Sequence, residues 1–373
     1  MKKYDVVIVG AGCSGLSLAY RLIQSSMRVC LLDNMTRKNR HRKTWSYWNT
    51  YKHPFEHLQI KSNKTLIVKN EYETVLDCSE YTYSTLDSYD FDDYIFSKID
   101  TSSNIDLLFE STIEDIELGD HSSKLIMSGG QTINCNYIFD SRPNKSLSGM
   151  KQVFKGLFVK FEENPRNFYP HLMDFSDKNQ FHFFYSLPLS DRNYLFESTY
   201  YTFSKMDKQE MTDEVHTYIQ NKYGKNYKVI REEYGEIPLT TSLSLNNKNS
   251  KYIKIGIPAG STRASTGYTF LNIQKQSDEY VKMLNGQNYI EHPRTFKNQI
   301  LRKMDNLLLM IIKDNPRDSM SILYKMFMYN DNNRIIRFLS DTPTVIDILS
   351  IIWNMPKLLF IKYAIKSITS SKI

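Results

Sequence analysis

The first forty residues combine two buried-strand patterns with one helical pattern. Residues 4–9 (YDVVIV) form an almost continuous apolar run rich in β-branched side chains, which is typical of a strand buried on both faces. Apolar side chains then recur at helical spacing over residues 16–23, and residues 28–32 form a second apolar run. The order strand, helix, strand predicts the beginning of an α/β sheet.

Residues 88–140 predict one short helix followed by a group of strands. The helix covers residues 88–99, with Ser88 as its cap. Strands are expected at residues 105–110, 112–118, 124–129 and 132–140. Gly119-Asp120 and Gly129-Gly130 are turn signals between them. We therefore expect a small antiparallel meander whose last strand returns to the first sheet.

A second sheet, rich in aromatic side chains, is predicted between residues 150 and 250. The runs 181–189 (FHFFYSLPL) and 193–203 (NYLFESTYYTF) are separated by the turn-prone residues 190–192, which predicts a β-hairpin. Residues 207–224 have an amphipathic helical pattern that is closed by Gly224. We expect this sheet to face the substrate.

Residues 252–260 predict another buried strand, and the chain from about residue 295 is predicted to be helical. The apolar stretch 346–368 carries Trp353 and three lysines, Lys357, Lys362 and Lys366. Most of this C-terminal region is interpreted as helices that pack against the rest of the protein. The alternative is a segment in a membrane interface, with Trp353 and the lysines at headgroup level. No stretch reaches the roughly 18 uninterrupted apolar residues of a spanning helix.

Composition and charge limit the class of protein. A chain of 373 residues, 41% hydrophobic and 24% charged, can fold into two or three domains and is not intrinsically disordered. Its four cysteines form no C-x-x-C pair, and Pro54 interrupts any helix joining His53 to His57, so we expect neither disulfides nor a metal site. Without a signal-peptide pattern, we expect a cytoplasmic protein.

The net charge of +7 is compatible with attraction to anionic lipid or nucleic acid. No nucleic-acid-binding motif is present, so we expect no nucleic-acid partner. The basic run 37–43 (RKNRHRK) is interpreted as a solvated loop.

Between the first strand and the first helix lies a G-x-G-x-x-G motif, which indicates a dinucleotide site. Gly10 permits the tight turn, Gly12 lets the backbone approach a pyrophosphate, and Gly15 lets helix and strand pack closely. Asp33 ends the second strand, where an acid can accept hydrogen bonds from ribose hydroxyls. The remaining expected contacts in the motif are Ala11 and Ser14. The motif alone does not separate FAD from NAD, and its position favours FAD by analogy between folds.

Two further segments are candidates for the same cofactor. Gly256 in the strand 252–260 precedes a Gly/Ser/Thr loop containing Thr266 and Gly267, which offers backbone donors for a second contact strip. The cluster Asp140-Ser141-Arg142-Pro143 follows the strand 132–140. Either it binds a ligand at the carboxyl end of the strand, or Asp140 caps local N–H groups.

Glu197 is the one carboxylate in the middle of the aromatic run 193–202. Alternation along a strand puts Glu197 on a face with Leu195, Thr199 and Tyr201, and Phe196 with Tyr200 on the other face. On a solvated face Glu197 is unremarkable. On a face lining an apolar cavity its pKa is raised, so it can hold a proton and donate it.

These segments together resemble the FAD-dependent lycopene cyclases of carotenoid biosynthesis, of the bacterial lycopene β-cyclase type. The motifs that carry the resemblance, in chain order, are residues 6–22, TWSYW (44–48), FDSRP (139–143), LPLSDRNYLFEST (187–199) and STGYTF (265–270). Ile257 follows Gly256 where flavoprotein hydroxylases usually have Asp, which favours a cyclase.

The resemblance implies an α/β flavoprotein with a Rossmann-like FAD-binding domain, an antiparallel-sheet substrate domain and a helical C-terminal region. The implied divisions are 1–60, 88–148 and 250–285 for FAD, 61–87 and 149–249 for substrate, and 286–373 for the helices, which contact the membrane in the interfacial alternative.

The implied reaction is the proton-initiated, non-redox closure of the ends of lycopene, or a related linear carotene, into β-ionone rings. It uses reduced FAD, with NAD(P)H as reductant, and its acid/base chemistry centres on Glu197. A membrane surface is the expected partner because the substrate is insoluble. The substrate-lining candidates are Trp45, Trp48, Arg142, Phe196, Tyr200 and Tyr268. The alternatives are a flavin monooxygenase or prenyl-chain reductase on an apolar substrate, and a non-catalytic FAD- or carotenoid-binding protein.

Overall fold

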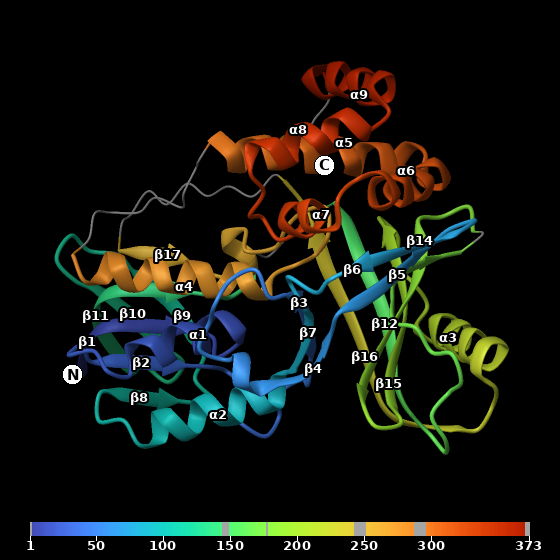
Figure 1. Cartoon of the computed structure of the whole chain (residues 1–373). Helices are drawn as coiled ribbons and strands as arrows, with labels where there is room; N and C mark the ends of the chain where they lie inside the picture. Colours follow the sequence, from blue (N-terminus) through green and yellow to red (C-terminus); the bar gives the residue numbers. More distant parts are fainter. Residues whose placement is uncertain (1, 144–148, 177, 242–250, 287–295, 370–373) are drawn as a thin grey trace.

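The computed structural model describes residues 2–143, 149–176, 178–241, 251–286 and 296–369. Two large sheets lie side by side, with a small sheet between them and the C-terminal helices across one end (Figure 1). This arrangement confirms the predicted mixture of a Rossmann-like domain, a β-rich domain and a helical C-terminal region.

The first sheet is mainly parallel and has the strand order β8-β2-β1-β11-β10-β9, with β17 also paired to β11. Its strands are β1 (Lys2–Val9), β2 (Val29–Leu32), β8 (Ile105–Leu108), β9 (Ile113–Glu117), β10 (Ser123–Met127), β11 (Thr132–Asp140) and β17 (Tyr252–Lys254). The predicted meander is confirmed for its last three strands, because β10 is antiparallel to both β9 and β11, and β11 returns parallel to β1. The strand predicted at residues 105–110 is not part of it, since β8 pairs parallel with β2 at the opposite edge of the sheet.

Both faces of β1 are buried, as its apolar run predicts. Val6 and Ile8 pack in one apolar cluster with the helices α1 (Cys13–Leu22), α2 (Ser88–Asp100) and α4 (Phe270–Leu284), whereas Val7 and Val9 pack in a second cluster with β10 and β11. An ion pair of 2.5 Å between Arg21 and Asp278 joins α1 to α4. The ion pair thereby joins residues 257 positions apart in the sequence.

The second sheet has the order β16-β12-β15-β14-β13-β5-β6. Its strands are β5 (Thr65–Lys69), β6 (Glu73–Asp77), β12 (Met150–Phe161), β13 (His171–Phe175), β14 (His182–Ser190), β15 (Asn193–Thr202) and β16 (Tyr227–Leu239). The β14–β15 hairpin and the helix α3 (Lys208–Tyr223), which ends at Gly224, confirm the predictions for this segment. In Figure 1, α3 lies on the side of this sheet away from the first sheet.

A three-stranded sheet of order β3-β7-β4 lies between the two large sheets. It consists of β3 (Thr44–Trp48), β4 (Gln59–Asn63) and β7 (Tyr83–Asp87), with the short 3₁₀ helix η1 (Glu56–Leu58) before β4. Residues 61–87 are therefore divided: β5 and β6 join the second sheet, whereas β7 and most of β4 belong to the intermediate one.

The chain after β17 differs from the predicted strand over residues 252–260. Only Tyr252–Lys254 are extended; Gly256 then adopts a φ of +71°, and Ile257–Ala259 form the 3₁₀ helix η2. Pro258 lies within η2, and its fixed φ suits a helical turn better than a central strand.

The C-terminal region is helical, as predicted from residue 295 onward. Its helices are α5 (Phe296–Asp314), α6 (Pro316–Tyr329), α7 (Asn332–Leu339), α8 (Val345–Asn354) and α9 (Lys357–Thr369). Pro356 divides the apolar stretch 346–368 into α8 and α9. In the described part of the chain, no helix has both the length and the apolar character needed to cross a bilayer.

The basic run 37–43 is not simply a solvated loop. Arg37 pairs with Asp100 at 2.5 Å, and Arg40 pairs with Asp92 at 2.6 Å, both on α2. Arg42 pairs at 2.8 Å with the Asp87 cap that precedes α2. Three of its arginines therefore fix this segment to α2, which sequence analysis missed because the acids lie 45 to 63 residues away.

Candidate active site

The glycine motif has the geometry that close approach of a ligand requires. Gly10 has a φ of +93°, and a Cβ at Gly15 would lie 1.9 Å from the Gly10 carbonyl oxygen. A Cβ at Gly12, in contrast, would meet no protein atom within 4 Å. Gly12 is also the N-cap of α1 and provides no side-chain hydrogen bond to its free N–H groups. The beginning of α1 is thus an open donor site suited to an anion.

Asp33 and Arg40 place opposite charges beside this motif. Asp33 accepts a hydrogen bond of 2.6 Å from the Ala11 N–H and another of 2.8 Å from the Met35 N–H. The Arg40 guanidinium donates to the Ala11 carbonyl oxygen. Sequence analysis missed Arg40 because only its place in the fold separates it from the other cations of the basic run.

The second predicted contact strip lies at the beginning of α1. A Cβ at Gly256 would meet the Ser14 hydroxyl at 2.5 Å, so the two segments are in close contact. Gly267 has a φ of +73°, and its α-carbon lies close enough to Gln152 that a Cβ there would be 2.4 Å from the Gln152 Oε1. The Gly256–Gly267 segment therefore connects the nucleotide motif to strand β12 of the second sheet.

Asp140 forms a saturated local cluster. Its fully buried carboxylate accepts hydrogen bonds from the Arg142 backbone and guanidinium, the Tyr252 hydroxyl and the Lys254 ammonium group. Although burial opposes ionisation, these donors hold the pKa of Asp140 below its usual value. This favours the local-capping alternative for Asp140 and commits Arg142 to the same cluster.

The loop at residues 261–269 is fixed from two directions. The Tyr201 hydroxyl, on β15, donates to the Ser265 carbonyl oxygen at 3.0 Å. The buried Arg263 pairs with Asp305 of α5 at 3.1 Å, and Ser265 donates to the same carboxylate at 2.7 Å. The C-terminal helices thus position the loop that lies between the two large sheets.

Glu197 lies on the face of the second sheet that is turned toward the nucleotide motif. We call this the Glu197 face; on β15 it comprises Leu195, Glu197, Thr199 and Tyr201. The Glu197 side chain is half-buried and accepts a hydrogen bond of 2.8 Å from the Thr199 hydroxyl. Burial raises the pKa of Glu197 to about 8; the Thr199 hydrogen bond opposes this rise and the charge of Glu233 adds to it. At neutral pH the carboxyl group therefore holds its proton.

A row of side chains crosses the sheet at Glu197. Tyr185 on β14 is opposite Glu197, Glu197 is opposite Gly156 on β12, and Gly156 is opposite Glu233 on β16. Since directly paired residues point to the same face, Glu197 and Glu233 are both on the Glu197 face with only a glycine between them. Sequence analysis missed Glu233, which appears in an ordinary run of charged residues, REEYGE.

Tyrosine side chains surround this row on the side of the intermediate sheet. The Tyr185 hydroxyl donates to the Tyr83 hydroxyl at 3.2 Å, and the hydroxyls of Tyr83 and Tyr268 are 3.4 Å apart. Trp48 packs on both Tyr83 and Tyr268, with ring centroids 4.9 and 5.3 Å apart. Two of the substrate-lining candidates, Trp48 and Tyr268, are thus brought together near Glu197.

The other substrate-lining candidates lie elsewhere. Phe196 packs with Val215 and Ile219 of α3, and Tyr200 donates to Glu214 of α3 at 2.7 Å, so both are on the face opposite Glu197. Strict alternation along β15 is the physical reason for this correction. Trp45 stacks on Phe270 of α4, on the opposite side of β3 from Trp48.

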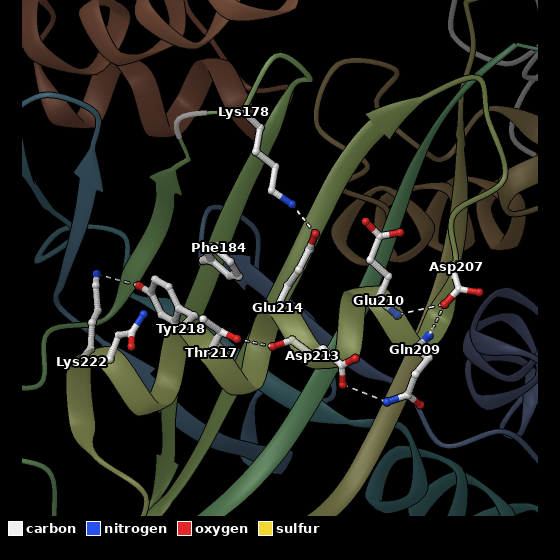
Figure 2. Close-up of a pocket in the computed structure, with 11 residues that line it drawn as sticks. Lys178, Phe184, Asp207, Gln209, Glu210, Asp213, Glu214, Thr217, Tyr218 and Lys222 are labelled. Carbon is white, nitrogen blue, oxygen red and sulfur yellow. Dashed lines mark hydrogen bonds and ion pairs between the residues drawn. The ribbon is translucent and has the colours of Figure 1, made fainter.

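A separate groove of about 750 Å³ runs along α3 on that opposite face (Figure 2). Its lining includes Lys178, Glu214, Tyr218 and Lys222, and both ammonium groups are paired: Lys178 with Glu214, and Lys222 with the Tyr218 hydroxyl at 3.0 Å. This groove is separated from Glu197 by the thickness of the sheet.

The mainly parallel sheet with its glycine motif and the mainly antiparallel sheet docked against it define a two-domain dinucleotide-binding fold. The family model described as "Lycopene cyclase protein" matches residues 5–364, and the chain belongs to this family. No curated protein sequence matches the chain.

Solved structures confirm the fold at low sequence identity. A geranylgeranyl bacteriochlorophyll reductase-like protein from Thermoplasma acidophilum is similar with a TM-score of 0.63 at 11% identity, covering 97% of this chain and 98% of that one. A flavoprotein/dehydrogenase from Cytophaga hutchinsonii gives 0.62 at 13% identity, with 97% and 100% covered. The p-nitrophenol 4-monooxygenase of Pseudomonas putida gives 0.58 at 10% identity, with 98% of both chains covered.

Proposed function

We propose that this protein is a flavin-dependent lycopene cyclase that converts the linear ends of lycopene, or a related linear carotene, into β-ionone rings. The observation that carries the proposal is Glu197. Its carboxyl group is desolvated and beside tyrosines, and within the described residues it forms no ion pair. A protonated carboxyl group in an apolar site is the acid that attack on a carbon–carbon double bond requires.

The nucleotide site fits FAD. The open position at Gly12 and the uncapped beginning of α1 match a pyrophosphate, and Asp33 is placed for a ribose. Gly256 and the Thr266–Gly267 turn lie between this site and the Glu197 face, where they would hold the flavin ring. When bound and reduced by NAD(P)H, the flavin supplies an electron-rich ring that favours positive charge on a nearby substrate.

The residues of this chain account for the remaining requirements. Glu197 donates its proton to the terminal double bond, and the rings of Tyr83, Tyr185 and Tyr268 offer π faces to the resulting carbocation. Burial raises the pKa of each of these three tyrosines, so they remain neutral and do not compete as proton acceptors. The apolar surroundings exclude water, which would otherwise capture the cation.

A second observation supports a peripheral location on a membrane. Helices α8 and α9 expose a group of large apolar side chains that we call the α8–α9 apolar face: Val345, Ile346, Leu349, Ile352, Trp353, Leu358, Ile361, Ile365 and Ile368. Trp353 is 73% exposed and Leu358 is 86% exposed. The Lys357 ammonium lies 3.9 Å from the Trp353 ring centroid, so a cation accompanies the apolar groups. Such a surface suits a bilayer with anionic headgroups, from which an insoluble carotene can be collected.

Expression in a bacterium that accumulates lycopene tests the proposed reaction. We expect the red cells to turn orange-yellow and to yield a cyclic carotene of unchanged mass. Glu197→Gln should leave lycopene in place, whereas Glu236→Gln, a partly exposed acid on the other face of β16, should not. Lycopene that persists beside soluble, flavin-loaded wild-type protein would refute the proposal. A product of changed mass, formed with stoichiometric loss of NAD(P)H, would instead support a monooxygenase or reductase.

A further inference from the structure

Glu233 is the nearest second carboxylate to Glu197 on the same face of the sheet. Strands β15 and β16 both pair with β12, so the two acids are two strand spacings apart, or roughly 9–10 Å between backbones. Gly156 occupies the intervening position, and a Cβ there would already lie 3.6 Å from the Glu197 Oε2. The same Cβ would lie 3.1 Å from the Leu195 Cδ1, so a side chain at this position would crowd the space beside Glu197. The two acids are thus on one face of the sheet with only a glycine between them.

The two acids have different hydrogen-bond partners. Glu233 receives the Thr44 N–H at 3.3 Å and the Arg231 guanidinium at 3.3 Å. Asp87 is the other charged group near Glu233, and Glu197 lies beyond Gly156 in the same row as Glu233. Among the described residues, the Thr199 hydroxyl is the only hydrogen-bond partner of the Glu197 carboxyl group. Burial raises the pKa of Glu233 above its ordinary value, and the Arg231 guanidinium and the Thr44 N–H oppose this rise. Since no cation and no backbone N–H among the described residues hydrogen-bonds to Glu197, Glu233 is the member of the pair that ionises more readily.

We propose that Glu233 is the base that removes the proton from the ring carbocation, so that Glu197 and Glu233 act as an acid–base pair across Gly156. This inference rests on the proposed function and names the group that completes the reaction. Glu233 is then a second catalytic residue, placed on the far side of the Gly156 gap from the acid.

The step balances without any other reactant. The Glu197 proton adds to the terminal double bond, whose π electrons form the new C–H bond. The next double bond attacks the resulting cation and forms the ring C–C bond. A C–H bond next to the ring cation then breaks; its electrons form the ring double bond and its proton goes to Glu233. After the product leaves and solvent enters the site, Glu233 releases this proton to solvent and Glu197 takes one up, which restores both groups. The product is an isomer of the substrate.

The position of the base also decides the type of ring. Several C–H bonds next to the ring cation can lose a proton, and each gives a different position of the double bond at the same mass. A base fixed by Arg231 and Thr44 reaches only one of them. The ring isomer is therefore a direct measure of where the base lies.

Purified wild-type protein, Glu233→Gln, Glu233→Asp and the control Glu236→Gln would be compared with lycopene in liposomes and reduced FAD. For Glu233→Gln we expect kcat to fall by about 100-fold or more at similar KM and flavin content, because a general base contributes roughly 10²–10⁴-fold. Its residual product should include other ring isomers. Glu233→Asp, which keeps the charge on a shorter side chain, should recover part of the rate and still change the isomer ratio. Glu236→Gln should match wild type.

Two results separate the failure of this inference from failure of the proposed function. If wild-type protein cyclises lycopene and both Glu233 variants give its rate and its single ring isomer, Glu233 is not the base. If Glu233→Gln does not fold, an unchanged rate and isomer in Glu233→Asp alone overturns the inference. If wild-type protein itself forms no cyclic carotene, the proposed function fails first.

Discussion

Replacing Glu197 by Gln should make the protein more stable at alkaline pH. The folded protein raises the pKa of Glu197 from 4.5 to about 8, whereas the unfolded chain returns it to an ordinary value. A carboxyl group with a raised folded pKa contributes its stability below the unfolded pKa and loses it as pH rises through the folded pKa. Above pH 8 the wild-type protein must bury a charge that Gln does not carry.

The magnitude follows from the difference between the two pKa values. At about 1.4 kcal/mol per pH unit, the change from 4.5 to about 8 corresponds to at most about 5 kcal/mol. Roughly 2 kcal/mol of this is already lost by pH 6, so the advantage of Glu197→Gln should grow by up to about 3 kcal/mol between pH 6 and pH 9.

Urea unfolding of both proteins at pH 6, 7.5 and 9, followed by tryptophan fluorescence, measures this difference. Glu236→Gln is the control. Hydrogen bonds from Lys151 and Tyr234 lower the pKa of Glu236, so this carboxylate stays ionised between pH 6 and pH 9. Parallel pH dependences of wild-type and Glu197→Gln stability would show that the Glu197 carboxyl titrates as in water. The reasoning that makes it a stored acid would then be refuted.

Three further predictions concern the cofactor site, the loop and the membrane surface. Gly12→Ala should fold normally but lose FAD, whereas Gly15→Ala should lower the melting temperature even without FAD, because its Cβ would be 1.9 Å from the Gly10 oxygen; equal flavin content in Gly12→Ala and wild type would contradict this. Arg263→Met should cost about 3–5 kcal/mol, measured by urea unfolding, because Asp305 is left buried without its cation; a loss below about 1 kcal/mol would show that Asp305 is otherwise satisfied. Trp353→Ser should reduce flotation with anionic liposomes and leave cyclisation of detergent-dispersed lycopene intact; unchanged flotation would exclude the α8–α9 apolar face as the contact.

The fold was predictable where local patterns are strong. A continuous apolar strand, a glycine motif and a helical repeat can only be joined in a few ways, so the first sheet follows from residues 4–33. The intermediate sheet was not predicted, because β3, β4 and β7 come from separate segments and each is only five residues long. Their pairing depends on tertiary contacts, such as Arg231 with Thr44 at 2.6 Å, that no local pattern contains.

The site was predictable only in part, for a related reason. Alternation identifies the two faces of β15 but not the face on which the nucleotide domain docks. Phe196 and Tyr200 were therefore named as substrate-lining candidates although they lie on the face opposite Glu197, which packs on α3. The relation of Glu233 and Gly156 to Glu197 depends on the strand register. That register pairs Gly156 with Glu197, 41 positions away, and with Glu233, 77 positions away. The available signal was that Gly156 pairs with an acid on each of its two neighbouring strands. This signal can be recognised only once the strand pairing is known.

The two faces of β15 explain why the proposed function assigns the acid to Glu197 rather than to Glu214, the other acid packed on this strand. On the α3 face, Glu214 accepts hydrogen bonds from Ser198 at 2.8 Å and Tyr200 at 2.7 Å and pairs with Lys178. Although burial opposes ionisation, these donors hold the pKa of Glu214 below its usual value. Glu197 is on the same strand as two of those donors but is turned away from them, and burial there raises its pKa instead. A saturated carboxylate stabilises the fold and has no proton to give. A carboxyl group left with one hydroxyl partner costs stability and retains its proton, which is the compromise expected of a group kept for chemistry.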